Sequence, residues 1–91
     1  DLNSTVIREC RRRVEHPAVT MEEIDAFSEQ ILDYILAASV DPVGNILVQK
    51  LIERGSEETR TEILDRLSPF IATVGIHKNG TWVVQKLINQ C

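Results

Sequence analysis

The sequence repeats itself, and this repeat limits the folds that the chain can adopt. Residues 44–52 read GNILVQKLI and residues 80–88 read GTWVVQKLI, an offset of 36 residues without a gap. At the same offset upstream, apolar residues match apolar residues: Phe27 with Ile63, Ile31 with Leu67, Tyr34 with Phe70, Ile35 with Ile71 and Val40 with Ile76. A fixed period between about 20 and 50 residues is the signature of a solenoid, in which each repeat buries its apolar face against its neighbours.

Residues 4–15 are predicted to form a short helix ahead of the repeats. Their apolar residues Val6, Cys10 and Val14 recur every four positions, and Pro17 ends the helix because proline disfavours helical geometry in the residue before it. Aligning this helix with the repeated stretch requires an insertion of one or two residues in the following loop. It is therefore either the last part of a preceding repeat or an end cap.

Each repeat unit is predicted to contain two helices. The first begins after Thr20, where Glu23 three residues later completes a capping box, and runs to about Ala38. Its counterpart spans residues 59–73, and Pro69 inside it predicts a kink or an early break. No segment alternates in polarity with a period of two over a useful length, so we expect an all-α chain.

The second helix of each unit contains the repeated stretch. In the first unit, we expect Asp41 to cap this helix, Pro42 to occupy its first turn, and Gly55 to end it after Arg54 in a left-handed conformation. Residues 77–80 open the second copy in the same register. We therefore predict a fragment of a longer α-solenoid, with residues 1–19 as a preceding partial repeat or cap, 20–55 as one repeat and 56–91 as another.

The composition points to a folded chain without a catalytic or metal centre. No apolar run approaches the roughly 20 residues that cross a bilayer, and no basic-then-apolar leader is present. Cys10 and Cys91 form neither a disulfide framework nor a metal-binding spacing, which favours a reducing, cytoplasmic setting. His16 and His77 have no partner at ligand or triad spacing, so we assign them to loops and expect no cofactor, no metal and no enzymatic activity.

The charge is unevenly distributed along the chain. A net charge of −4 argues at first against a polyanionic partner. However, residues 17–40 hold five acids and no base, whereas residues 77–91 carry Lys78 and Lys86 with no acid. Arg11–Arg13 form a basic cluster that is either a solvated helix face or a phosphate-contacting patch.

Polar side chains in the repeated stretch are predicted to share one helix face. Asn45 and Gln49 are four residues apart, as are Thr81 and Gln85, so the members of each pair lie one above the other and face outward. Stacked groups that both donate and accept hydrogen bonds match the edge of a nucleobase. Alternatively, Asn45 caps its own helical turn and Gln49 is a solvent-exposed filler.

The residue after the first member of each pair is a candidate for stacking. Ile46 and Trp82 occupy this position, where a side chain leans toward the gap between successive repeats. Stacking of a base on an aromatic side chain contributes about 1–3 kcal/mol. Trp82 is alternatively a core residue. Lys50 and Lys86, next to the two glutamines, are either solvated or bound to phosphates.

The repeated stretches resemble PUF (Pumilio-homology) repeats. The pattern Gly-Asn-x-x-Val-Gln-Lys-Leu-Ile, the 36-residue period and the acidic first helix are similar to that family, and the run HKNGTWVVQK is particularly similar to its fungal branch. The resemblance covers residues 21–91. It implies a crescent of about eight three-helix repeats, whose second helices bind single-stranded RNA along the concave face with roughly one base per repeat.

The resemblance also implies roles for individual residues. Asn45 and Gln49 correspond to a uracil-reading pair with Ile46 in the stacking position, and Thr81 and Gln85 to an adenine-reading pair with Trp82 stacking. Two positions depart from the family pattern. Ile46 replaces the usual aromatic residue or arginine, which predicts weaker stacking, and Thr81 followed by Trp82 is an unusual combination.

We therefore predict a sequence-selective, single-stranded RNA-binding solenoid that acts on mRNA 3′ untranslated regions in post-transcriptional regulation. Its phosphate contacts would come from Lys50, Lys86, Arg11 and Arg12, and protein partners would bind the convex face. The alternative is a protein-interaction platform of the HEAT or armadillo kind. A fragment of such an array exposes apolar flanks, so we also expect it to self-associate.

Overall fold

The structure is a computed structural model that describes residues 4–90. Within this range the chain forms seven α-helices and two short 3₁₀ helices, and contains no strand. The elements are α1 (Ser4–Val14), α2 (Met21–Ile31), η1 (Leu32–Tyr34), α3 (Ile35–Val40), α4 (Gly44–Arg54), α5 (Glu57–Leu67), η2 (Ser68–Phe70), α6 (Ile71–Ile76) and α7 (Gly80–Gln90). The predicted all-α class is confirmed.

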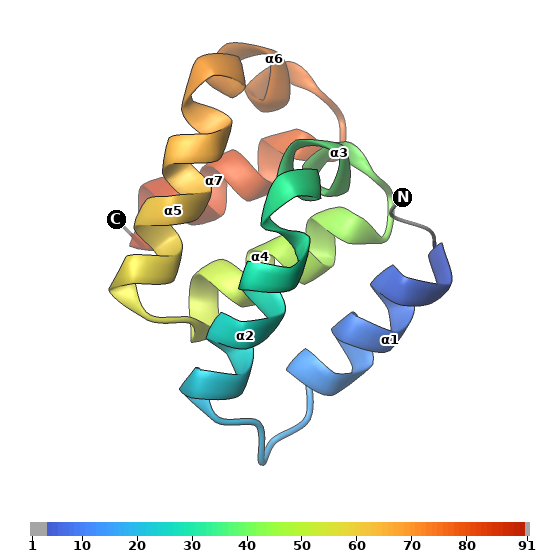
Figure 1. Ribbon diagram of the computed structural model, residues 1–91. Helices are drawn as coiled ribbons and strands as arrows, with labels where there is room; N and C mark the ends of the chain where they lie inside the picture. Colours follow the sequence, from blue (N-terminus) through green and yellow to red (C-terminus); the bar gives the residue numbers. More distant parts are fainter. Residues whose placement is uncertain (1–3, 91) are drawn as a thin grey trace.

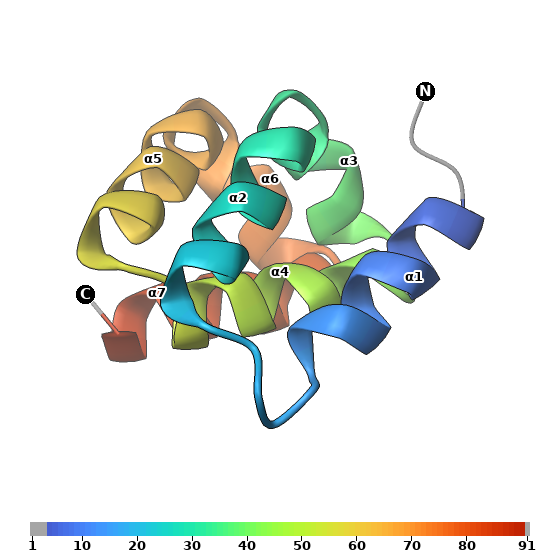
Figure 2. The same ribbon diagram turned by 60° about the horizontal axis from the view of Figure 1, so that its bottom comes forward.

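The helices form two layers. Helices α1, α4 and α7 follow one another in one layer, while α2, α3, α5 and α6 form the other (Figures 1 and 2). Helix α4 packs against α1 on one side and against α7 on the other. The copies of the repeated stretch are therefore neighbouring helices, as expected for a solenoid.

The first helix of each unit is broken, so each unit has three α-helices rather than the predicted two. A single helix from Thr20 to Ala38 is wrong, because α2 ends at Ile31 and η1 separates it from α3. The break lets both Ile35 and Ala38 reach the core. In the second unit the chain breaks at the equivalent place, around Pro69, and that prediction is confirmed.

Helix starts follow the predicted capping chemistry only in part. The capping box of Thr20 and Glu23 is present. Helix α4 itself begins at Gly44, later than predicted. Asp41 nevertheless caps this end as expected: its Oδ2 accepts hydrogen bonds from the backbone N–H groups of Val43 at 2.8 Å and Gly44 at 2.7 Å, and its carbonyl accepts the Asn45 N–H at 3.0 Å.

A histidine performs the same task at the start of α7. The Nδ1 atom of His77 accepts hydrogen bonds from the backbone N–H groups of Asn79 at 3.0 Å and Gly80 at 3.4 Å. An imidazole therefore replaces the carboxylate of Asp41 at the equivalent position. His16 also binds a loop, since its Nδ1 accepts from the Ala18 N–H at 3.1 Å.

Glycines at the ends of α4 and the start of α7 permit close packing. A Cβ atom on Gly44 would lie 2.5 Å from the carbonyl oxygen of Ala38, and one on Gly80 would overlap the equivalent carbonyl of Val74. Gly55 is not left-handed as predicted: its backbone is extended, with φ −77° and ψ 174°. A Cβ on Gly55 would instead lie 2.5 Å from the carbonyl oxygen of Leu51, so space rather than backbone conformation favours glycine.

Asp25 of α2 joins the two repeats. Its Oδ1 accepts hydrogen bonds from the Ser56 backbone N–H at 3.0 Å and from the Thr59 hydroxyl at 2.8 Å, at the start of α5. Partial burial by itself raises the pKa of Asp25, but these hydrogen bonds and the charge of Arg60 outweigh it and hold the pKa below its ordinary value. The junction is therefore stabilised by the ionised carboxylate.

The second unit leaves apolar side chains uncovered that the first unit buries. Ile52 is fully buried under its neighbours, whereas the equivalent Ile88 of α7 is 67% exposed. Ile35 is likewise buried and its equivalent Ile71 is exposed, and Ile76 is 88% exposed. This apolar edge lies on the side of α6 and α7 on which no described helix packs.

We expect Gly44→Ala to lower the free energy of unfolding by roughly 1–3 kcal/mol, because the added methyl group would overlap the Ala38 backbone. Gly75→Ala is the matched control. A Cβ there finds nothing closer than 3.9 Å, and alanine is favoured in helices by roughly 0.5–1 kcal/mol. Urea denaturation followed by circular dichroism measures both variants, and equal effects would show that Gly44 is not constrained by packing.

We expect Asp25→Asn to lower the free energy of unfolding by roughly 1.5 kcal/mol at neutral pH, with exposed Asp65→Asn as control. The folded-state pKa lies below the unfolded value of about 3.9. The stabilisation is therefore complete above that value and disappears as pH falls through the folded-state pKa. The difference in urea midpoint between wild type and variant should close below about pH 4, and a constant difference down to strongly acidic pH would contradict this assignment.

The exposed apolar edge should promote self-association of the chain at high concentration. Multi-angle light scattering should show a mass that rises with concentration. The double variant Ile76→Ser and Ile88→Ser should remain monomeric, because it removes the two most exposed apolar side chains of this edge. A wild-type chain that stays monomeric throughout would contradict the prediction.

Candidate nucleic-acid interface

The solvent-facing side of α4 and α7 gathers most of the residues predicted from the repeat. A cavity of about 430 Å³ lies between these helices, and its lining consists of Gln49, Thr81, Trp82, Gln85, Lys86 and Asn89. The glutamine of one copy therefore faces residues of the next copy across a shared groove. Asn89 was not anticipated, although it lies one further turn along the same face from Gln85.

Asn45 does not face outward as expected. It is only 5% exposed, and its Nδ2 donates hydrogen bonds to the backbone carbonyls of Asp41 at 2.8 Å and Pro42 at 3.0 Å. The alternative reading of Asn45 as a residue that caps its own turn describes this conformation. Its Oδ1 accepts a hydrogen bond from Gln49 Nε2 at 3.1 Å, so the two amides form a pair with Asn45 behind and Gln49 toward solvent.

The second pair has a different arrangement. Thr81 is half-buried and Gln85 is exposed, and neither side chain makes a hydrogen bond to another residue in the range 4–90. The four-residue spacing places both along the cavity, as predicted. The amide of Gln85 is thus accessible to a ligand without first breaking an internal bond.

The two candidate stacking residues differ in exposure. Trp82 is 58% exposed and lines the cavity beside Gln49, so the alternative reading of Trp82 as a core residue is wrong. Ile46, in the first turn of α4, is half-buried and does not line this cavity. An exposed indole next to two amides offers a flat apolar surface and polar edges in one groove.

The two lysines share one carboxylate. Lys86 Nζ lies 3.0 Å from Glu53 Oε2, and Lys50 Nζ lies 4.0 Å from Glu53 Oε1. The hydrogen bond from Lys86 lowers the pKa of Glu53 and outweighs the effect of burial. The sequence does not indicate that Glu53 pairs with Lys86, because the two residues are 33 positions apart and no local pattern links them. One net positive charge remains beside the groove.

The arginines of α1 lie apart from this groove. Arg11 is half-buried with its Nε 3.4 Å from Glu15 Oε1. Arg12 is exposed, and its Nη2 lies 2.7 Å from Glu9 Oε1. The structure therefore does not bring these two predicted phosphate contacts together with Lys50 and Lys86.

Other kinds of site find no support in the described part of the chain. Among residues 4–90, no group of three or more His, Cys, Asp or Glu side chains could hold a metal ion. None of the helices in this range is sufficiently long and apolar to span a membrane.

Comparison with known proteins bears on the repeat directly. The sequence model of the Pumilio-family RNA-binding repeat matches residues 34–68 and residues 71–91, so each match contains one copy of the repeated stretch. The chain belongs to this family.

Pumilio-family relatives include fungal proteins, in line with the resemblance noted above. A Pumilio domain-containing protein of Schizosaccharomyces pombe is 40% identical over 83 residues, which is 91% of this chain and 13% of that protein. The mRNA-binding protein PUF2 of Saccharomyces cerevisiae is 34% identical over 82 residues, which is 90% of this chain and 8% of that protein. The chain thus spans only a small part of these relatives.

A solved Pumilio structure has the same fold. The crystal structure of the PUM-HD domain of S. pombe Puf1 in complex with RNA superimposes with a TM-score of 0.90 at 38% sequence identity. The match covers 97% of this chain and 24% of that one. This match confirms the predicted Pumilio-type helical architecture, and its coverage extends to α1.

Proposed function

We propose that this chain binds single-stranded RNA sequence-selectively along the solvent face of α1, α4 and α7. The observation that carries the proposal is the groove between α4 and α7, in which amides of successive repeats meet an exposed indole. The relatives support it, because one is an mRNA-binding protein and the solved Puf1 domain is in complex with RNA.

The first base would be read by the paired amides of α4. Uracil presents an N–H donor between two carbonyl acceptors, and a carboxamide can satisfy one donor and one acceptor of such an edge. In this proposal Gln49 contacts the base, while Asn45 holds Gln49 Nε2 and so selects the orientation of its amide. Ile46 gives this base a smaller stacking surface than an aromatic residue would.

The second base would occupy the groove beside α7. Gln85 and Thr81 are proposed to bind its edge, with adenine as the preferred base, and Trp82 to stack on its face. Lys50 and Lys86 would contact the RNA backbone, with their charge partly neutralised by Glu53.

In the cell, we propose a cytoplasmic role in post-transcriptional regulation of mRNA through 3′ untranslated regions, as a binding module and not an enzyme. Protein partners would use the opposite layer, where Tyr34 and Phe70 are exposed at equivalent positions of the two repeats. A platform that binds only protein is the rival function, and the experiment below separates the two.

The double change Asn45→Ser and Gln49→Glu should shift base preference from uracil toward guanine. The carboxylate accepts hydrogen bonds from the N–H groups of guanine and repels the carbonyls of uracil. Selection of RNA from a random pool measures the preference, and quenching of Trp82, the single tryptophan of the chain, reports occupancy.

The matched control is Gln30→Glu, which makes the same chemical change at an exposed position of α2. It should leave the selected RNA unchanged. An unaltered base preference in the double variant would show that these amides do not read a base. Absence of any RNA binding by the wild-type chain would favour the protein platform.

A further inference from the structure

Helix α1 lies in the stack in the same rotational register as α4 and α7. Each of the three buries residues at positions i, i+3 and i+7: Ile7, Cys10 and Val14 in α1, Gly44, Leu47 and Leu51 in α4, and Gly80, Val83 and Leu87 in α7. Arg54 of α4 fixes α1 in place by donating hydrogen bonds to the carbonyls of Val14 and His16. The burial pattern therefore aligns α1 with the repeated stretch, with one extra residue in the loop that follows.

In this register, the side of α1 that corresponds to the proposed RNA-binding face of α4 carries different side chains. Arg8 and Arg12 occupy the positions of Asn45 and Gln49, and both are exposed. Guanidinium groups only donate hydrogen bonds, so the pair lacks the acceptors with which the amides match a base edge. Glu9 occupies the position of Trp82, and a carboxylate offers no face on which a base can stack.

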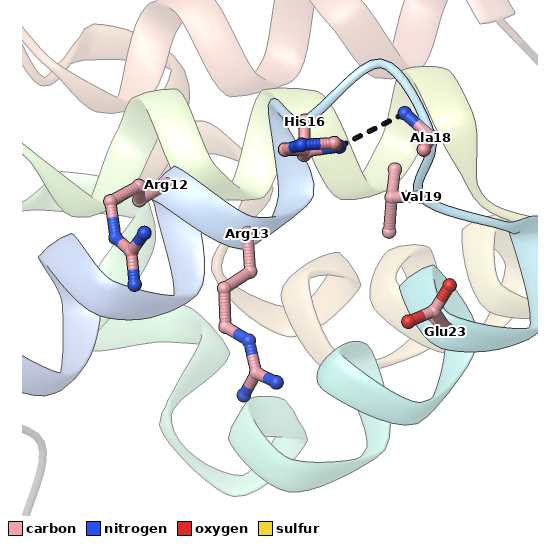
Figure 3. Close-up of a pocket in the computed structure, with 6 residues that line it drawn as sticks. All are labelled: Arg12, Arg13, His16, Ala18, Val19 and Glu23. Carbon is pink, nitrogen blue, oxygen red and sulfur yellow. Dashed lines mark hydrogen bonds between the residues drawn. The ribbon is translucent and has the colours of Figure 1, made fainter.

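A cavity of about 320 Å³ opens beside Arg12 and its neighbour Arg13 (Figure 3). Its lining consists of Arg12, Arg13, His16, Ala18, Val19 and Glu23. Arg12 and Arg13 extend from the same side of α1, and Arg13 reaches toward α2 (Figure 3). The Arg13 guanidinium lies 5.4 Å from the centre of the Phe27 ring, a cation–π contact that orients it.

The polar groups of the cavity are arranged as donors. His16 accepts the Ala18 N–H on Nδ1, which leaves Nε2 as the ring nitrogen that can donate. The acidic member, Glu23, already accepts hydrogen bonds from the backbone N–H and the hydroxyl of Thr20 at 3.1 Å each. The lining of the cavity thus contains two guanidinium groups, one imidazole and a single carboxylate that is already engaged.

We propose that this cavity binds a phosphate of the RNA backbone, held by Arg12 and Arg13, one helix beyond the amide pair of α4. The inference rests on the proposed RNA binding and assigns α1 to a repeat that precedes residues 20–55. Guanidinium groups bind phosphate oxygens with paired, charge-assisted hydrogen bonds. Such a contact adds affinity for any sequence, and it gives a chain of net charge −4 a local positive site for a polyanion.

Glu9 moderates this site. It forms a bidentate contact with Arg12, with Nη2 to Oε1 at 2.7 Å and Nε to Oε2 at 3.4 Å. The opposite edge of the guanidinium remains able to donate to a phosphate. Removing the carboxylate charge should therefore strengthen phosphate binding, whereas removing the guanidinium groups should weaken it.

The test is the salt dependence of RNA binding by the full chain. Fluorescence anisotropy would follow labelled oligouridylate and oligoadenylate of about twelve nucleotides between about 50 and 200 mM KCl. The double variant Arg12→Gln and Arg13→Gln should weaken binding roughly 3- to 10-fold for both RNAs alike, and the slope of log affinity against log salt should become shallower by about 0.7 to 1, as for the loss of one phosphate contact. Glu9→Gln should raise affinity for both.

Arg66→Gln is the matched control, because Arg66 pairs with Asp33 at 3.0 Å in the opposite layer. It should change neither affinity nor slope, and circular dichroism should show all variants folded. An unchanged slope in the double variant, or a loss confined to one of the two RNAs, would overturn the phosphate site and leave base reading by α4 and α7 standing. A wild-type chain that binds neither RNA would overturn both proposals.

Discussion

The structure depends on α4 having a helix on each side. Leu47, Val48, Leu51 and Ile52 are all fully buried, so this helix has almost no apolar side chain in contact with water. Complete burial of such a side chain contributes about 1.5–3 kcal/mol, and four in one helix form the centre of the apolar core. The equivalent Ile88 of α7, with a neighbour on one side only, is largely exposed. Burial in this fold is thus a property of position in the stack and not of the residue type.

The close approach of each short helix to the next long helix determines the position of the groove between α4 and α7. Gly44 and Gly80 allow the last turn of the preceding short helix to rest on the first turn of α4 and α7. The turn ahead of each start is held by a different side chain, a carboxylate at Asp41 and an imidazole at His77. The residues that line the groove follow directly after these turns, so the same geometry is reached with two different capping groups.

Local pattern predicted the repeat, the helical class and the packing face of α4, because these follow from spacing alone. In α1 it named Val6, which is exposed, where Ile7 is the buried residue. The local pattern gave a wrong or incomplete prediction at three further places where contacts in the folded chain determine the conformation. The break after Ile31 contains no proline that would have predicted it, and it allows Ile35 to be buried. The inward turn of Asn45 is a local effect instead, because its amide donates to the carbonyls of Asp41 and Pro42 in the turn just before the helix, as the alternative interpretation allowed. The contact between Glu53 and Lys86 joins two repeats and has no signal in either one.

The attachment of α1 to α4 has a consequence for how such an array can change. Arg54 holds α1 through main-chain carbonyl oxygens, which every residue possesses. The outward side chains of α1 take no part in that attachment, so they can be exchanged without moving the helix from its place. A solenoid built in this way can change what the outward face of one helix recognises, while the spacing between successive helices stays constant.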